Sequence, residues 1–212
     1  MANIYKLSIT KDAFVNKIVE SAMKDLDEFF GIKWTYGRPN ILLCKDRKTI
    51  VALTGQTGNS VIGWEWNRDI YVLDHANFEK ESEHTYNAEK YARLLKHELV
   101  HAYTIATIKK QRKCKPDWLW EGLADYLSGY SRHRKQIGSF KNFLMFYEND
   151  SGKVYEESVF AVEILVEKFG KTKILNLLKQ LSTCKGKAEF NKLFDKIYGF
   201  KPTYNNFNNL KK

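Results

Sequence analysis

The chain has few residues of the kinds that mark secreted, fibrous or disordered proteins. Only three cysteines occur among its 212 residues, Cys44, Cys114 and Cys184, about 70 positions apart. Their odd number and wide spacing provide neither a disulfide framework nor a Cys-x-x-Cys metal pair, so we expect a reducing compartment. Three prolines and 12 glycines, against 43% hydrophobic residues, exclude collagen-like and disordered chains. The chain is therefore expected to fold around a sizeable core.

Long apolar runs are also missing. The first ten residues show no basic segment followed by an apolar stretch, and no run approaches the roughly 20 residues that span a bilayer. We therefore expect a soluble, cytoplasmic protein without a membrane partner. Lys and Arg exceed Asp and Glu by 35 to 25, a net charge of +10. The basic residues are spread along most of the chain, so nucleic-acid binding is the less favoured alternative.

Hydrophobic periodicity predicts an α+β fold whose sheet lies in the first half of the chain. Apolar residues at helical spacing over 11–30, ended by Gly31, predict a first helix. Short β-branched and aromatic runs separated by Gly and Asn predict a small antiparallel or mixed sheet. These runs lie at 41–44, 49–53, 61–66 and 70–73.

The second half of the chain is predicted to be helical after a polar connection over 74–87. Helices are expected at 88–109, 117–130, 156–169, 171–182 and 187–198. Gly170 is expected to end one of these helices, and the Asn-rich tail over 204–212 reads as a docking strand end or a frayed terminus. No linker separates the two halves. Residues 1–212 therefore form one domain with an N-terminal lobe (about 1–110) and a C-terminal helical lobe (about 111–212).

The pentapeptide His97-Glu98-Leu99-Val100-His101 lies inside a predicted helix. Two histidines four residues apart project from one helix face, one turn apart, so both imidazoles can reach a single zinc ion. Glu98 lies beside them without ligating, where it can take a proton from an activated water and deliver it to a leaving nitrogen. A chain of this composition contains about 0.01 such matches by chance. A purely structural helix that carries the pattern is the alternative.

The segment 116–127 is predicted to begin a new helix, and this helix is expected to supply a carboxylate ligand for the same ion. Glu121 lies 20 residues past His101, which lets the chain turn and an antiparallel helix complete a site of two histidines and one glutamate. Asp125, one turn later, is suited to bind the non-ligating nitrogen of His97 and fix its tautomer. The alternative is a solvated helix face, but the flanking Trp and Leu residues favour burial.

The two segments HELVH and WLWEGLADYL together resemble the gluzincin metallopeptidases, the thermolysin-like group with HExxH and a downstream Glu. Within that group they look like the minimal peptidase-MA-like proteins, over about 70–194. The resemblance implies a zincin-like fold that binds one Zn²⁺ through the two histidines and Glu121. It also implies hydrolysis of peptide or other amide bonds, with Glu98 as general acid and base and a peptide or protein as the substrate.

The chain also resembles the catalytic domain of the aminopeptidase and leukotriene hydrolase family. In that family a Val-Tyr-x-Lys-Gly segment opens a helix after the zinc site, and its tyrosine steadies the oxyanion. The corresponding residues here are Val154-Tyr155-Glu156-Glu157-Ser158. The resemblance implies Tyr155 as an oxyanion donor. A buried core tyrosine is the alternative, because Glu157 and Ser158 replace the Lys and Gly of the family.

The same family uses a Gly-Ala-Met-Glu-Asn strand whose glutamate holds the free amine of the substrate. This chain has Gly63-Trp64-Glu65-Trp66-Asn67 in that region, which implies Gly63, Trp64 and Glu65 as substrate-binding residues. Glu65 falls one position early, and a one-residue displacement in a strand sends a side chain to the opposite face. We therefore expect the strand to pair with an extended peptide backbone rather than to recognise an amine.

Two basic clusters and two histidines are expected at the surface. Lys109–Lys115 is interpreted as a solvated helix end and Arg132–Lys135 as a solvated loop, with a rim that attracts acidic substrates as the alternative. His75 and His84 are interpreted as surface histidines. A scaffold or binding protein that keeps the zincin fold without turnover is the other functional class. The presence of all three ligands and the base favours catalysis.

Overall fold

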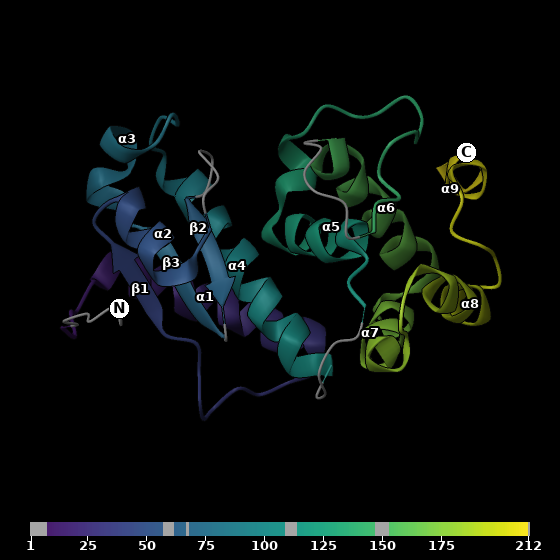
Figure 1. The fold of residues 1–212 in the computed structure, drawn as a ribbon, viewed down its shortest axis with the longest axis horizontal. Helices are drawn as coiled ribbons and strands as arrows, with labels where there is room; N and C mark the ends of the chain where they lie inside the picture. Colours follow the sequence, from purple (N-terminus) through teal and green to yellow (C-terminus); the bar gives the residue numbers. More distant parts are fainter. Residues whose placement is uncertain (1–7, 57–61, 67, 109–113, 147–152, 212) are drawn as a thin grey trace.

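A computed structural model describes residues 8–56, 62–66, 68–108, 114–146 and 153–211 of the chain (Figure 1). These residues form a helix-rich fold with one small mixed sheet, so the predicted α+β class is confirmed. In chain order the elements are α1 (Ala13–Phe30), β1 (Ile41–Cys44), α2 (Arg47–Thr54), β2 (Gly63–Trp66), β3 (Asp69–Leu73), η1 (His75–Asn77), α3 (Phe78–Glu81), α4 (Ala88–Ile108), α5 (Asp117–Ser128), η2 (Tyr130–His133), α6 (Lys153–Phe169), α7 (Lys171–Gln180), η3 (Leu181–Thr183), α8 (Lys187–Tyr198) and α9 (Tyr204–Lys211).

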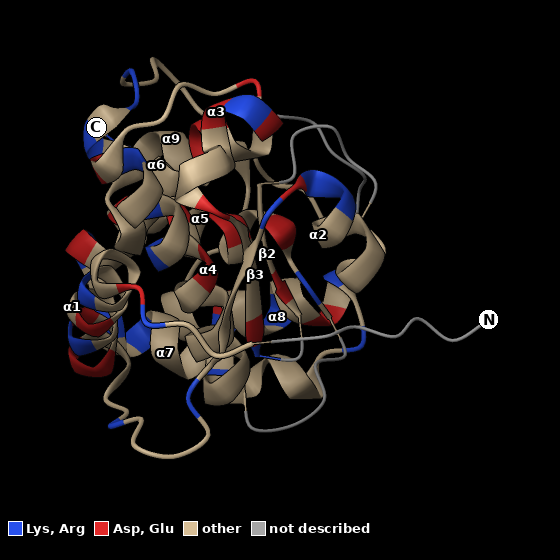
Figure 2. Ribbon diagram, turned by 90° about the vertical axis from the view of Figure 1, so that its left-hand side faces the viewer, with Lys and Arg blue, Asp and Glu red and all other residues tan. Residues whose placement is uncertain are grey.

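The elements up to α4 lie on one side of the molecule and those from α5 onward on the other (Figure 1). Helix α4 is central, because it packs against α1 and β2 on its own side and against α5 across from them. None of the helices in the described part of the chain combines the length and apolar character needed to cross a membrane. Lys and Arg occur on several separate elements, α1, α2 and α3 among them (Figure 2).

The first helix forms where the sequence predicted it. The side chain of Asp12 accepts a hydrogen bond from the backbone N–H of Val15 at 2.9 Å, which caps the helix start. Gly31 ends the helix in the left-handed conformation. The buried face of α1 packs against α4, the helix that carries HELVH, and so supports its position.

The sheet has the strand order β1-β3-β2, with β1 parallel and β2 antiparallel to β3. The predicted strand at 49–53 is wrong, because these residues belong to helix α2. Asp46 caps that helix by accepting the N–H of Thr49 at 2.7 Å, and Gly55 ends it. The parallel pair β1 and β3 needs a long crossover connection, and α2 occupies part of it. Strand β2 is left at the edge of the sheet, beside α4.

The C-terminal half follows the predicted helices up to residue 198. Gly170 has a positive φ, and its N–H donates to Val166 O at 2.8 Å, so α6 ends there as predicted. The interpretation of 204–212 as a strand end or frayed terminus is wrong, because α9 is a helix with a buried Phe207. The side-chain amide of Asn208 both accepts the N–H of Phe140 and donates to its carbonyl, which docks α9 on the loop before α6.

Helices α5 and α6 approach closely at Gly122. A Cβ atom at this position would lie 2.6 Å from the carbonyl oxygen of Ser158, a backbone atom that cannot rotate away. We expect Gly122→Ala to lower the free energy of unfolding by about 1–3 kcal/mol, because overpacking outweighs the better helix propensity of Ala. Urea denaturation would measure the loss. The control Gly138→Ala enters open space and should be close to neutral, and equal stability of the two variants would contradict the packing argument.

Candidate metal centre

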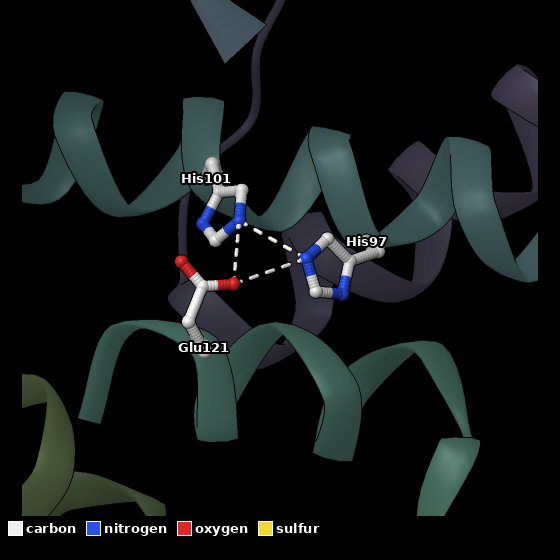
Figure 3. A group of neighbouring side chains, drawn as sticks. All are labelled: His97, His101 and Glu121. Atoms are coloured by element: carbon white, nitrogen blue, oxygen red, sulfur yellow. Dashed lines mark hydrogen bonds and ion pairs between the residues drawn. The ribbon is translucent and has the colours of Figure 1, made fainter. Parts of the chain in front are cut away.

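Three side chains with metal-binding atoms converge between α4 and α5 (Figure 3). His97 and His101 lie one turn apart on α4, and Glu121 faces them from α5, as the sequence predicted. The two Nε2 atoms are 3.1 Å apart. Glu121 Oε2 lies 3.4 Å from Nε2 of His97 and 3.5 Å from Nε2 of His101. All three atoms therefore face one common point.

The spacing of these atoms fits a tetrahedral zinc ion. Ligand atoms about 2.0–2.1 Å from a tetrahedral centre lie about 3.3–3.4 Å from each other. The three observed separations, between 3.1 and 3.5 Å, bracket that value. The donor set of two imidazoles and one carboxylate is that of an open catalytic zinc site, which leaves a fourth position for water or substrate. Without an ion, one of the two facing Nε2 atoms would need to carry a hydrogen, because two lone pairs at this distance would repel each other.

His97 is oriented by Asp125. The Nδ1 atom of His97 lies 3.0 Å from Asp125 Oδ1, the contact that the sequence predicted for this pair. A carboxylate can only accept at this bond, so Nδ1 carries a hydrogen and Nε2 is the nitrogen that could bind an ion after losing its own proton. The side chain of Asp125 is only 3% exposed. The contact is thus sheltered from water.

His101 is oriented by packing. Its ring stacks on Trp120, with the centroids 5.3 Å apart and the planes 8° from parallel. The Nδ1 atom of His101 is buried and has no hydrogen-bond partner in the described part of the chain. The indole of Trp120 therefore substitutes for a carboxylate in holding this imidazole in place.

The charges at the centre favour an anionic carboxylate between imidazoles. Burial opposes ionisation of Glu121, but the attraction of His101 and the hydrogen bonds to both histidines hold the pKa of Glu121 well below its usual range. Burial likewise opposes the charged form of His97, yet its hydrogen bonds to Asp125 and Glu121 raise the pKa of His97 well above its usual value. Burial lowers the pKa of His101. Without an ion, the cluster thus holds positive charge on His97.

Glu98 is buried next to the three ligands and beside strand β2. Burial raises the pKa of Glu98 to about 7, with further contributions from Glu121 and Glu65 and opposition from His97. The backbone N–H of Glu65 favours the charged form of Glu98 and so lowers its pKa. A Cβ atom at Gly63 would lie 3.0 Å from Glu98 Oε1, so a larger residue would require the Glu98 side chain to shift. The edge strand therefore packs closely against Glu98.

A cleft of about 550 Å³ contains the centre. It is lined by the three side chains that could hold a metal and by Glu98, and also by every other predicted site residue: Gly63, Trp64, Glu65, Asp125 and Tyr155. Tyr155 lies in the first turn of α6 and is half-buried. The structure therefore places all the candidate residues around one cavity.

The side chain of Glu65 has a partner within its own hairpin. Its Oε1 accepts the backbone N–H of Arg68 at 2.7 Å, in the connection between β2 and β3. Arg68 adopts a positive φ, and this hydrogen bond supports the left-handed turn. The strand reaches the candidate metal centre through its backbone, which approaches the Glu98 side chain at Gly63.

The sequence interpretation left several residues of the cleft lining out of the site, among them Lys115, Trp120, Tyr130 and Arg134. Lys115 Nζ lies 4.0 Å from Glu121 Oε1, on the side away from the histidines. The prediction that Arg134 lies in a solvated loop is wrong, because its Nη2 lies 2.7 Å from Asp125 Oδ2. Lys115 and Arg134 could have been found from the sequence, because each is a cation a few residues away from an acid predicted to be buried, Glu121 and Asp125 respectively. The rest of the first cluster, residues 109–113, lies outside the described residues.

Of the two histidines expected at the surface, only His84 is exposed. His75 is half-buried, with Nε2 2.9 Å from Asp12 Oδ2 and its ring against Phe14. This pair joins the cap of α1 to the segment that follows the sheet, far in sequence from the metal centre. The ring contacts given for His75 in the described part of the chain are with Phe14, Tyr86 and Tyr91, which do not line the cleft, so the pair is best explained as structural.

Comparison of the chain with protein-family models, with curated proteins and with solved structures finds no match. The case for a metal centre therefore depends on the residues themselves and on their geometry.

Proposed function

We propose that the protein is a zinc-dependent hydrolase of peptide or other amide bonds with a zincin-like fold. The observation that carries this proposal is the triangle of His97, His101 and Glu121 at tetrahedral spacing, with the carboxylate of Glu98 buried beside it. The three ligands would hold one Zn²⁺. When bound, the ion supplies Lewis acidity toward a carbonyl oxygen and toward water.

Glu98 is proposed to move the proton. Its carboxylate takes a proton from the water that attacks the carbonyl carbon and then delivers it to the leaving nitrogen. A group with a pKa near 7 is suited to both directions of transfer, and burial in the cleft brings Glu98 to that range. Close packing of the edge strand at Gly63 limits the movement of the carboxylate between the two steps.

Substrate is proposed to enter beside β2, because this edge strand borders the cleft and pairs on one side only among the described strands. An extended peptide can add to such an edge through backbone hydrogen bonds. Trp64 and Trp66 also line the cleft and offer apolar contacts to side chains of the peptide. This arrangement favours a peptide or protein substrate over a small amide.

Tyr155 is proposed to donate its hydroxyl to the carbonyl oxygen as negative charge develops. Such a donor acts mainly in the transition state, so Tyr155→Phe should lower kcat about 10²–10³-fold and leave KM and zinc content nearly unchanged. Steady-state kinetics and metal analysis on one preparation would measure this. Tyr198→Phe is the matched control, because it removes a buried hydroxyl that has no hydrogen-bond partner among the described residues. An active but destabilised Tyr155→Phe would instead assign Tyr155 to the core.

The proposed reaction is tested by exposing the zinc-loaded protein to a diverse peptide mixture and mapping new termini by mass spectrometry. Cleavage that stops on addition of a chelator and returns with zinc supports the proposal. A metal-loaded protein that cleaves no peptide bond would favour the other class, a zincin-like binding protein without turnover. Pull-down of intact peptides by the loaded protein would distinguish that class from an enzyme whose substrate is missing from the mixture.

A further inference from the structure

Both carboxylate oxygens of Asp125 are engaged, and by different partners. Oδ1 faces Nδ1 of His97 at 3.0 Å, and Oδ2 accepts a hydrogen bond from Nη2 of Arg134 at 2.7 Å. Because the two contacts use separate oxygens, together they fix the plane of the carboxylate as well as its position. The bond to Arg134 joins two ionised groups and is therefore among the stronger kinds of hydrogen bond.

The local fold brings Arg134 back to the helix that carries Asp125. Gly129, with a φ of 87°, ends α5 in the left-handed conformation, and the chain then reverses through η2. The guanidinium of Arg134 lies over the ring of Tyr130, 5.7 Å from its centroid. The edge of the same ring packs against His97, with the centroids 6.3 Å apart. Arg134 is thus held by packing as well as by its ion pair.

We propose that Arg134 is a positioning residue of the metal centre, which acts through Asp125 to set the orientation and tautomer of His97 and thereby the affinity for zinc. A carboxylate as buried as Asp125 needs a charged or hydrogen-bonding partner for each oxygen, and Arg134 is the partner of Oδ2. Without Arg134, the Asp125 carboxylate would lose the contact that fixes its orientation, and His97 would lose a well-placed acceptor for the hydrogen on Nδ1. This inference rests on the proposed function in taking His97 as a zinc ligand.

The test compares Arg134→Met, Arg134→Lys and the control Arg132→Met. Arg132 is exposed, lies two residues away and carries the same charge, so the control removes one cation without touching Asp125. Zinc affinity is measured by competition with a chromogenic chelator. Arg134→Met should weaken zinc binding about 10-fold. This is the lower end of the loss of metal affinity expected when a residue that supports a metal ligand is removed. Arg134→Lys should keep part of the affinity, and Arg132→Met should match the wild type.

A double-mutant cycle separates action through Asp125 from a general loss of stability. In an Asp125→Asn background, Arg134→Met should weaken zinc binding less than about twofold, because the partner through which it acts is already altered. An equal loss in both backgrounds would overturn the proposal. Imidazole signals of ¹⁵N-histidine-labelled, zinc-free protein give a second readout. Arg134→Met should shift the Nδ1–H resonance of His97, and the control should not.

Arg134 also lines the cleft, so contact with an acidic group of the substrate is the competing role. Unchanged zinc affinity together with a raised KM for acidic peptides would assign that role and overturn ours. A wild-type protein that takes up no zinc would overturn both this proposal and the proposed function. A protein that binds zinc and cleaves no peptide would overturn the proposed hydrolysis alone, and the chelator measurements would still decide the role of Arg134.

Discussion

Glu98→Gln is expected to reduce hydrolysis by about 10²–10⁴-fold while the protein keeps its fold and its zinc. The amide has nearly the shape of the carboxylate, so it can keep the same packing against Gly63. It cannot take up a proton and return it, so only the chemical step should fail. The rate of peptide cleavage, the zinc content and the melting temperature of one preparation would be measured together.

Glu89→Gln is the matched control for this prediction. Glu89 lies on the same helix and is exposed, and the same isosteric change there should leave cleavage at the wild-type rate. If Glu98→Gln cleaved peptides as fast as the wild type, Glu98 would not be the acid and base, and the proposed mechanism would have to be abandoned. A loss of zinc in this variant would instead point to a role in metal binding.

Glu121→Ala is expected to weaken zinc binding by more than about 100-fold, beyond the 10–100-fold expected for Asp125→Ala. The reason is that Glu121 is the sole carboxylate in the triangle of ligand atoms, so its loss leaves two imidazoles from one helix. The wild type should hold one zinc per chain. Elemental analysis and chelator competition would measure both quantities.

Glu156→Ala, an exposed acid on the neighbouring helix, provides the control for Glu121→Ala. It should bind zinc as the wild type does, because it removes the same charge without removing a ligand. Equal zinc retention by Glu121→Ala and the control would show that the third ligand is another residue. A wild type with less than about a tenth of an equivalent, and no uptake on addition of zinc, would exclude the zinc site itself.

The features of the site that repeat at helical spacing could be predicted from the sequence. His97 and His101 share a face because they are one turn apart, and Glu121 and Asp125 share a face of the next helix for the same reason. The pairing of the two helices then required only that the chain turn back between them. The contact between Asp125 and His97 follows from this arrangement, and the structure shows it.

The features that the sequence missed have two causes, a local capping signal in α2 and tertiary packing elsewhere. Thr49–Leu53 is β-branched like a strand, but Asp46 and Gly55 cap it as a helix. The Asn-rich residues of α9 are poor helix formers, and burial of Phe207 overrides that weakness. Arg134 reads as part of a solvated basic run until the reversal after Gly129 brings it back to Asp125.

The three ligand atoms come from helices that pack with different parts of the chain. His97 and His101 lie on α4, which packs with α1 and β2, whereas Glu121 lies on α5, which packs on α6. An ion held by all three joins the two halves, so its binding energy also opposes unfolding. By mass action, a free zinc concentration of 100 times the dissociation constant adds about 2.7 kcal/mol to stability. The supply of metal would then govern how long the protein survives heat or proteases, independently of any reaction that it catalyses.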